Sequence, residues 1–184
     1  MVQYSQTENA GKSTVRLTFK SLDQLLDLDD PSPYPHKELT EIAEDAIANH
    51  VGDIPFKKEV DLVVSLPSGT LNHEIKENLP EAIRQHFAFR ASEKALEVVR
   101  KKRRLKAGLK FTVALIVLMS IAGGVINLIP ESDRFVHVLI AGIFTILAWA
   151  AIWDTAEAYA LDYRALVGNM KVYEKISRMN MRIE

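Results

Sequence analysis

The chain has 184 residues, a net charge of −1 and no cysteine. A chain of that length can form one small soluble domain and a helical hairpin, and little more. The lack of cysteine excludes disulfides, thiolate metal sites and a cysteine nucleophile. The neutral total hides an uneven distribution, because the first ~110 residues carry most of the charge and the next ~43 almost none.

The N-terminal segment begins without a clear pattern. Residues 1–13 lack periodicity and predict a flexible leader. Residues 1–14 are polar and lack the apolar core of a signal peptide, so we expect the first export signal further along the chain. Residues 14–20 then alternate, with Val15, Leu17 and Phe19 on one side, which predicts a half-buried strand.

Residues 27–35 form a proline-rich turn that carries three acids, Asp27, Asp29 and Asp30. The acids could suggest a calcium loop, but their spacing does not match an EF-hand. We therefore interpret them as turn acids and helix caps. Residues 36–51 predict an amphipathic helix, with Glu44 among the acids assigned to its solvated face.

Residues 59–66 predict a second strand, because Val60, Leu62 and Val64 alternate with residues of the other face. Strand, helix and strand within ~50 residues indicate a right-handed parallel crossover. Two strands alone make a weak sheet. We therefore expect the leader, the next helix or a second copy of the chain to extend or cover it, and hence a homo-oligomer.

A long helix is predicted from about residue 78, with Pro80 in its first turn. No proline interrupts it before Pro130, so it can continue into an apolar run at 111–129. A turn at 130–134 and a second apolar run at 135–153 follow. Each run has about 19 residues, enough to cross the hydrocarbon core of a bilayer as a helix. A third helix is expected from 154 to about 178.

The basic run at 100–110 precedes the first apolar run and contains no acid. Such a run predicts that the preceding domain stays in the cytoplasm. We therefore expect a protein of the cell (inner) membrane with two spans and both termini in the cytoplasm. It also favours contact with anionic lipid headgroups. Nucleic acid is not the expected partner, because no aromatic residues are interleaved for stacking.

An antiparallel hairpin with its turn near residue 132 places residues whose numbers add to about 264 at equal depth. This arithmetic predicts an interhelix ion-pair layer, with a carboxylate pair at a pore mouth as the alternative. It also predicts a close helix contact through small residues. The ion-pair residues are Lys106, Lys110, Asp154 and Glu157, and the helix-packing residues are Gly123, Gly124, Ala141 and Gly142.

The sequence has no recognisable catalytic motif. Gly11-Lys12-Ser13 lacks the earlier glycine of a phosphate-binding loop, and the five histidines are scattered. His86 lies near Arg90 on the long helix, where it could form an anion site or pack at the surface. We therefore expect no catalytic residue, no metal and no cofactor.

Several motifs occur together in order: Asp30-Pro-Ser-Pro-Tyr34, Ile83-Arg-Gln-His-Phe-Ala-Phe-Arg90, Trp149-x-x-x-Trp153-x-x-x-Glu157, then Asp162 and Tyr173-Glu-Lys. This set resembles an uncharacterised family of small prokaryotic proteins with two transmembrane helices. The chain departs from it at Thr155 and Leu161, where the family has proline and tyrosine. The resemblance implies no established activity. It marks Asp30, Arg90, Glu157 and Asp162 as positions to inspect. The candidate polar site is Asp30, His86, Arg90 and Asp162.

We expect an α+β membrane protein in four parts: a flexible leader (1–13), a β-α-β-α cytoplasmic domain (14–99), a transmembrane hairpin (100–153) and a C-terminal cytoplasmic helix and tail (154–184). The favoured function is a membrane-anchored interaction or regulatory protein that associates with itself and with an unknown protein partner. The first alternative is a small oligomeric channel or transport accessory subunit. The second is a membrane-surface enzyme, if Asp30, His86, Arg90 and Glu157 converge.

Overall fold

The computed structural model describes residues 2–9, 12–67, 69, 71–128 and 134–184. The predicted turn at 130–134 therefore lies almost wholly outside the described residues. The chain divides into two compact units. Unit 1 comprises Met1–Ala95 and Gly168–Glu184, and unit 2 comprises Leu96–Val167. The fold is mixed α+β, as predicted.

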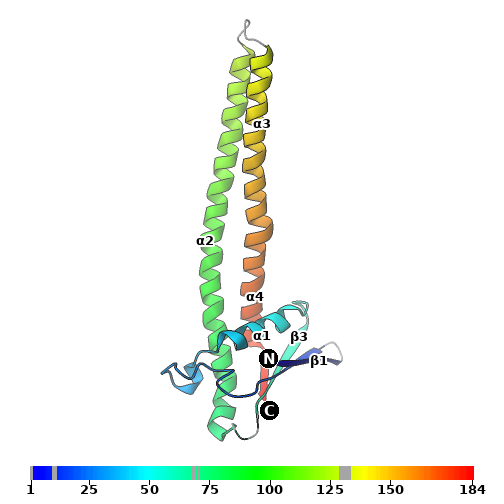
Figure 1. The fold of residues 1–184 in the computed structure, drawn as a ribbon, viewed down its shortest axis with the longest axis vertical. Coiled ribbons are helices and arrows are strands. Elements are labelled where there is room, and N and C mark those ends of the chain that lie inside the picture. The colour runs from blue at the N-terminus through cyan, green and yellow to red at the C-terminus, as the bar shows by residue number, and fades with distance from the viewer. Residues whose placement is uncertain (1, 10–11, 68, 70, 129–133) are drawn as a thin grey trace. The chain divides into compact units, whose positions relative to one another are not determined.

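Unit 1 is built on a four-stranded sheet with the order β1-β2-β3-β4 (Figure 1). β1 (Gln3–Asn9) pairs antiparallel with β2 (Lys12–Thr18). β2 pairs in parallel with β3 (Glu59–Ser65), and β3 pairs in parallel with β4 (Asn180–Ile183). The parallel pairing of the two predicted strands is thus confirmed.

The two outer strands were not predicted. β1 lies within the predicted flexible leader, and that expectation is wrong for Gln3–Asn9. Residues 4–8 of β1 are exposed, so the sequence of this strand has no apolar alternation from which it could be predicted. The strand is held by backbone pairing with β2. β4 is only four residues long, with Met181 and Ile183 buried and Arg182 exposed. Because the chain itself supplies both strands, the sheet gives no reason to expect a second copy, and self-association stays a prediction.

Helix α1 (Glu41–Gly52) begins five residues later than predicted. A short 3₁₀ turn, η1 (Tyr34–His36), precedes it. The start is fixed by Thr40, whose side-chain oxygen accepts a hydrogen bond from the Ala43 backbone N–H at 3.2 Å, satisfying a donor that the first turn leaves free. Its inner face packs on the sheet through Ala43, Ile47 and Val51, all buried.

Helix α2 (His73–Asn127) begins earlier than predicted, because Asn72 caps it by accepting from the Ile75 backbone N–H at 2.7 Å. Pro80 therefore lies inside the helix rather than in its first turn. The first part of α2 belongs to unit 1 and contributes Ile75, Leu79, Ile83 and Phe87 to the core. The same core includes Val15, Leu17, Phe19, Leu62, Val64, Ile176 and Ile183.

Unit 2 contains the rest of α2 and helix α3 (Arg134–Glu157), which lie side by side. α3 continues through a π-helical turn, η2 (Ala158–Tyr163), into α4 (Arg164–Arg178), so the helix predicted from 154 has a π turn near its start. On α2 the less exposed residues recur at alternating steps of four and three, the spacing of a two-helix seam. They are Lys101, Leu105, Gly108, Thr112, Leu115 and Met119, opposite Phe144, Ala148, Ala151, Thr155 and Ala158.

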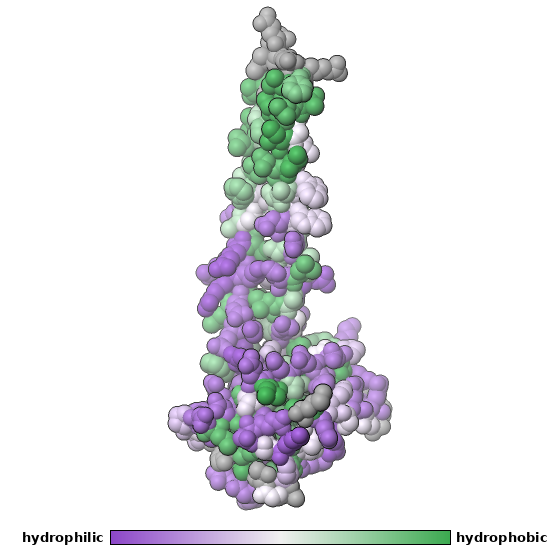
Figure 2. Space-filling view, in the orientation of Figure 1, coloured by the Kyte–Doolittle hydropathy of each residue, from purple (hydrophilic) through white to green (hydrophobic). Residues whose placement is uncertain are grey.

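Two of the described helices are long and apolar enough to cross a membrane. In the most apolar 18-residue window of each, only 6% of the first and 0% of the second is buried. Figure 2 shows hydrophobic side chains gathered over one end of the α2–α3 pair and hydrophilic ones towards its other end. The exposed residues include Phe111, Leu118, Phe135, Ile146 and Trp149, each at least 60% exposed.

Candidate functional site

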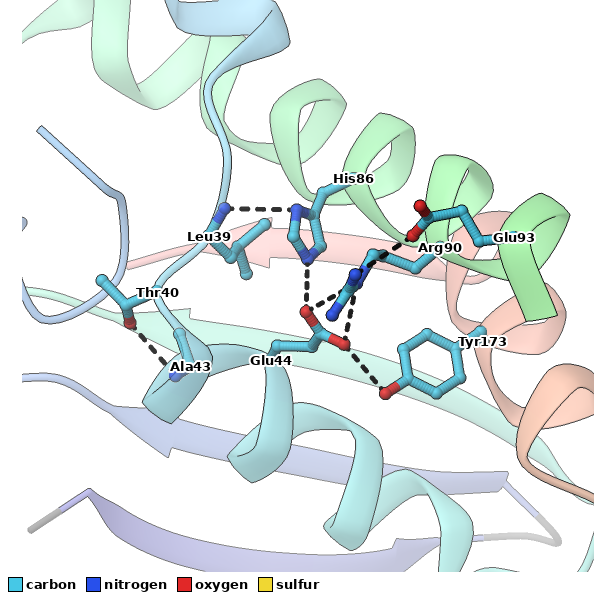
Figure 3. Close-up of polar contacts among 8 residues, drawn as sticks. All are labelled: Leu39, Thr40, Ala43, Glu44, His86, Arg90, Glu93 and Tyr173. Carbon is cyan, nitrogen blue, oxygen red and sulfur yellow. Dashed lines mark hydrogen bonds and ion pairs between the residues drawn. The ribbon is translucent and has the colours of Figure 1, made fainter. Parts of the chain in front are cut away.

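The most developed polar site lies in unit 1 around Glu44, where three helices meet (Figure 3). Glu44 is on α1 and its side chain is only 9% exposed. From α2, His86 Nε2 lies 3.0 Å from Oε2, and Arg90 Nε donates to Oε1 at 3.1 Å and to Oε2 at 3.0 Å. From α4, the Tyr173 hydroxyl donates to Oε1 at 2.9 Å. We call these four residues the Glu44 cluster.

The hydrogen bonds assign the tautomer of His86. Its Nδ1 accepts the backbone N–H of Leu39 at 3.3 Å, so that nitrogen carries no proton. The proton is therefore on Nε2, which donates to Glu44. His86 therefore accepts from the Leu39 backbone and donates to Glu44, which fixes the orientation of its ring.

The hydrogen bonds of the Glu44 cluster stabilise the charged form of Glu44 and the neutral form of Tyr173. Burial raises the pKa of Glu44, but the hydrogen bonds from Arg90, His86 and Tyr173 lower it by more, so it lies below the ordinary value. Burial and the hydrogen bond to Glu44 raise the pKa of Tyr173 to about 12. Glu44 is therefore ionised and Tyr173 neutral at physiological pH, as their hydrogen bond requires.

The arrangement is that of a structural clamp. Three donors engage the Glu44 carboxylate: His86 Nε2 on one oxygen, the Tyr173 hydroxyl on the other, and the single Nε–H of Arg90 shared between both oxygens. Arg90 donates further to Glu93 at 3.1 Å. The cluster ties α1, α2 and α4 together around a buried charge that is fully paired.

The burial of Glu44 was not predicted from the sequence, which placed this acid on the solvated face of its helix. In the structure Glu44 is 7% exposed. The signal was present, because Glu44, Ile47 and Val51 are spaced at i, i+3 and i+7 and therefore share one helix face. An acid on an apolar stripe requires a buried partner, and His86 and Arg90, both singled out from sequence, are those partners.

Asp30 lies outside the cluster and shapes its own turn. Its carboxylate accepts the backbone N–H groups of Ser32 and Glu38, each at 2.9 Å. Those hydrogen bonds lower the pKa of Asp30. The interpretation of this acid as a turn residue is confirmed, but α1 is capped by Thr40 rather than by Asp30. Asp30 does not converge with His86 and Arg90.

Asp162, the fourth residue of the candidate polar site, belongs to unit 2. Its Oδ2 lies 2.5 Å from Lys101 Nζ, an ion pair across the two helices. The candidate polar site thus divides into three separate places: Asp30 in its turn, His86 and Arg90 in the Glu44 cluster, and Asp162 with Lys101. Glu157, the further residue that an enzyme required, is also in unit 2 and exposed.

The predicted depth register of the hairpin agrees with the contacts, but the predicted ion-pair layer does not. Lys101 pairs with Asp162, and Thr112 Oγ1 donates to the Ala151 carbonyl at 3.3 Å, each within a residue of the predicted register. In the described part of the chain, no ion pair joins Lys106 or Lys110 to Asp154 or Glu157, and all four are exposed. Equal depth does not make two side chains face each other, because the direction around each helix axis also matters.

The close approach of the two helices also lies elsewhere than predicted. A Cβ added at Gly123, Gly124 or Gly142 would meet nothing within 4 Å, and Ala141 is exposed. A Cβ added at Gly108 would lie 3.8 Å from Thr155 Oγ1. The small residue at the seam is therefore Gly108, next to the hydrogen-bonded pair Thr112 and Thr155 at 3.2 Å.

A cleft of about 500 Å³ opens on unit 1 where β3 and β4 begin. Phe56, at its edge, is 56% exposed, and Lys175 Nζ lies 5.6 Å from the centre of its ring. The Asp61 carboxylate pairs with Lys12 at 3.0 Å through Oδ2, while its buried Oδ1 has no partner among the described residues. This cleft places one exposed aromatic ring among charged side chains.

Within the described residues, no group of three or more His, Asp or Glu side chains could hold a metal ion. Comparisons with protein-family models, curated proteins and solved structures gave no match. The resemblance to a two-span membrane protein family therefore stays an expectation from the motifs.

Proposed function

We propose that this protein is a membrane-anchored interaction or regulatory protein, in which the α2–α3 hairpin spans a bilayer and displays unit 1 at its surface. The observation that carries the proposal is the exposure of the apolar helices. A soluble protein buries its most apolar helices, yet here at most 6% of either window is buried. Lipid would remove that surface from water.

The polar groups within the apolar runs support lipid surroundings. The hydroxyls of Ser120 and Thr145 donate to the carbonyls of Ile116 and Ala141 on their own helices, each at 2.8 Å. A hydroxyl turned back onto its own helix needs no water. Trp149 and Trp153 stack with ring centres 5.6 Å apart at the end of the second run, where aromatic residues favour the membrane interface.

The sheet supports a topology with both termini on one side. β1 and β4 belong to the same four-stranded sheet, so the segments before and after the hairpin fold together. A chain that leaves this unit and returns to it must cross a membrane an even number of times, which two spans satisfy. The basic run at 100–110 favours the cytoplasmic side for that unit.

Binding is the role that unit 1 supports best. Its buried polar cluster is fully paired and holds helices together, so it offers no free nucleophile or base. Its cleft offers the exposed ring of Phe56 beside Lys175 instead. We therefore place the contact with a protein partner at this cleft.

The anchoring is tested by extracting membranes from expressing cells with alkaline carbonate and then with detergent. We expect the full chain to stay in the pellet through carbonate and to be released only by detergent. Release by carbonate alone, or recovery in the soluble fraction, would contradict the anchor. The partner contact is tested by site-specific photocrosslinking from Lys57, which lines the cleft: the adduct should be lost in Phe56→Ala and kept in the matched exposed variant Leu28→Ala.

A further inference from the structure

A groove of about 640 Å³ runs along the α2–α3 pair within unit 2. One end is lined by aliphatic side chains and the other by two lysines and two tyrosines. No acidic residue lines it. Lys102 and Lys106 on α2 and Tyr159 and Tyr163 on η2 line the charged end, and Val113 and Ile116 on α2 line the aliphatic end.

The charged end of the groove is formed by two lysines on α2. Lys102 and Lys106 are four residues apart on α2 and so lie on one helix face. Both are exposed, and none of the ion pairs among the described residues uses either of them. The neighbouring Lys101, by contrast, is paired with Asp162.

The hydroxyl groups at the floor of the groove already have hydrogen-bond partners. Thr155 Oγ1 donates its proton to the Ala151 carbonyl at 3.0 Å. Thr112 is 5% exposed, and its single hydroxyl proton is shared between the Ala151 carbonyl at 3.3 Å and Thr155 Oγ1 at 3.2 Å. Since these hydroxyls need no further partner, the floor suits an apolar occupant rather than a polar one.

Lys106 lies at the depth of the headgroup layer of the proposed membrane, and Lys102 lies about one helical turn further from the hydrocarbon core. Lys106 precedes the first apolar run by five residues, or about 7.5 Å along the helix axis, and Lys102 precedes it by nine residues, or about 13.5 Å, so Lys102 reaches a headgroup from the water side with its flexible side chain. A headgroup layer is roughly 5–8 Å thick on each side of the hydrocarbon core. The aliphatic end, with Val113 and Ile116, then lies at the depth of acyl chains.

We propose that this groove binds one anionic phospholipid. Its phosphate lies between Lys102 and Lys106, within reach of the Tyr159 and Tyr163 hydroxyls, and one acyl chain follows Leu109, Val113 and Ile152. This inference rests on the proposed membrane anchor and deepens it, because it assigns one retained lipid to a defined site. A second copy of the hairpin is a poorer occupant, since its equivalent face would bring two more lysines to the same place.

The test uses the full chain, purified in a neutral detergent and titrated in native mass spectrometry with phosphatidylglycerol or phosphatidylcholine of identical acyl chains. We expect one phosphatidylglycerol per chain to be retained in preference to phosphatidylcholine. A membrane-surface cation contributes about 1 kcal/mol, or roughly fivefold in affinity. K102Q/K106Q should therefore weaken phosphatidylglycerol binding by roughly 30-fold.

Two matched controls separate a site from diffuse attraction. R103Q/K110Q removes the same charge from residues outside the groove and should change the affinity by less than about threefold. Ala156→Phe fills the groove without changing charge and should weaken binding, whereas Ala150→Phe, outside the groove, should not. Excess inorganic phosphate should not displace the lipid.

Equal losses in the two charge variants, or equal binding of the two lipids, would overturn the groove as a lipid site, as would displacement by phosphate. Such a result would leave the anchor intact if the chain still resists carbonate extraction. A chain that fails that extraction overturns the anchor instead, so the two failures are distinguishable.

Discussion

The Tyr173 hydroxyl and the Glu44 carboxylate are 129 residues apart in the chain and 2.9 Å apart in the structure. This hydrogen bond joins the last helix to the first. It shows that the segment after the hairpin is part of the same folded unit as the segment before it, which is also the basis of the topology proposed here.

Removing the Glu44 carboxylate should destabilise unit 1. Glu44→Ala leaves Arg90, His86 and Tyr173 without their shared acceptor, and breaking a buried pair in this way costs about 3 kcal/mol. Glu44→Gln should cost about 1–3 kcal/mol, because its amide group opposes one of the donors. Urea denaturation followed by tyrosine fluorescence in detergent measures both.

Asp45→Asn is the matched control for Glu44, because Asp45 is the next residue on α1 and is exposed. We expect its free energy of unfolding to stay within about 0.5 kcal/mol of the parent chain. Equal effects of the two substitutions would show that the Glu44 cluster does not hold the helices together.

The stability of unit 1 should fall at both ends of the pH scale. The folded pKa of Glu44 lies below 4.5, so its contribution is present above pH 4.5 and is lost as the pH falls through the folded value. The pKa of Tyr173 rises from 10.0 to about 12, so its contribution is present below pH 10.0 and is lost as the pH rises towards 12. Unfolding free energies from pH 3 to 12 check both limbs.

Single substitutions identify the residue that causes each limb of the dependence of stability on pH. Glu44→Gln should flatten the acid limb, although Asp30 keeps part of it because its pKa is also lowered. Tyr173→Phe should flatten the alkaline limb. An alkaline limb that is unchanged in Tyr173→Phe would mean that another group causes it.

The C-terminal strand should be necessary for the sheet. Ile183 is 7% exposed and belongs to the core, so Ile183→Ala should cost about 2–5 kcal/mol. Arg182 points to the opposite face and is exposed, so Arg182→Ala should change stability by no more than about 0.5 kcal/mol. Limited proteolysis distinguishes the two, and similar digestion rates would contradict the pairing of β4 with β3.

Gly108 should be the glycine on which hairpin packing depends. Gly108→Ala should be tolerated, because its Cβ would lie at an ordinary contact distance of 3.8 Å from Thr155. Gly108→Leu overfills the seam and should destabilise the hairpin by about 1–3 kcal/mol. Gly124→Leu, where nothing lies within 4 Å, should be neutral. Thermal unfolding in detergent measures the three, and a larger effect at Gly124 would restore the originally predicted contact.

The sequence predicted those features that depend on a regular period. The alternation of Val15 and Leu17, and of Leu62 and Val64, located the two central strands. The rise per residue of a helix gave the register that Lys101 and Asp162 follow. The direction of side chains around the helix axis was not determined by that arithmetic, which is why Lys106 and Glu157 are level without pairing.

The remaining features have little or no local pattern. β1 is exposed along most of its length and is fixed only by hydrogen bonds to β2, and β4 offers just two apolar residues. Glu44 was predicted to be exposed because it is charged, although its spacing from Ile47 and Val51 puts it on the apolar face of the helix. Its burial depends on Tyr173, whose contact with α1 no local pattern could show.

Cysteine accessibility tests the central claim, that lipid surrounds the apolar helices, most directly, because the chain has no cysteine of its own. Val117 on α2 is 53% exposed in the structure, and Arg103 is an exposed residue on the same helix. In open membrane vesicles a water-soluble maleimide should label Arg103→Cys and leave Val117→Cys unlabelled until detergent is added. Equal labelling of both variants without detergent would place those helices in water and contradict the account.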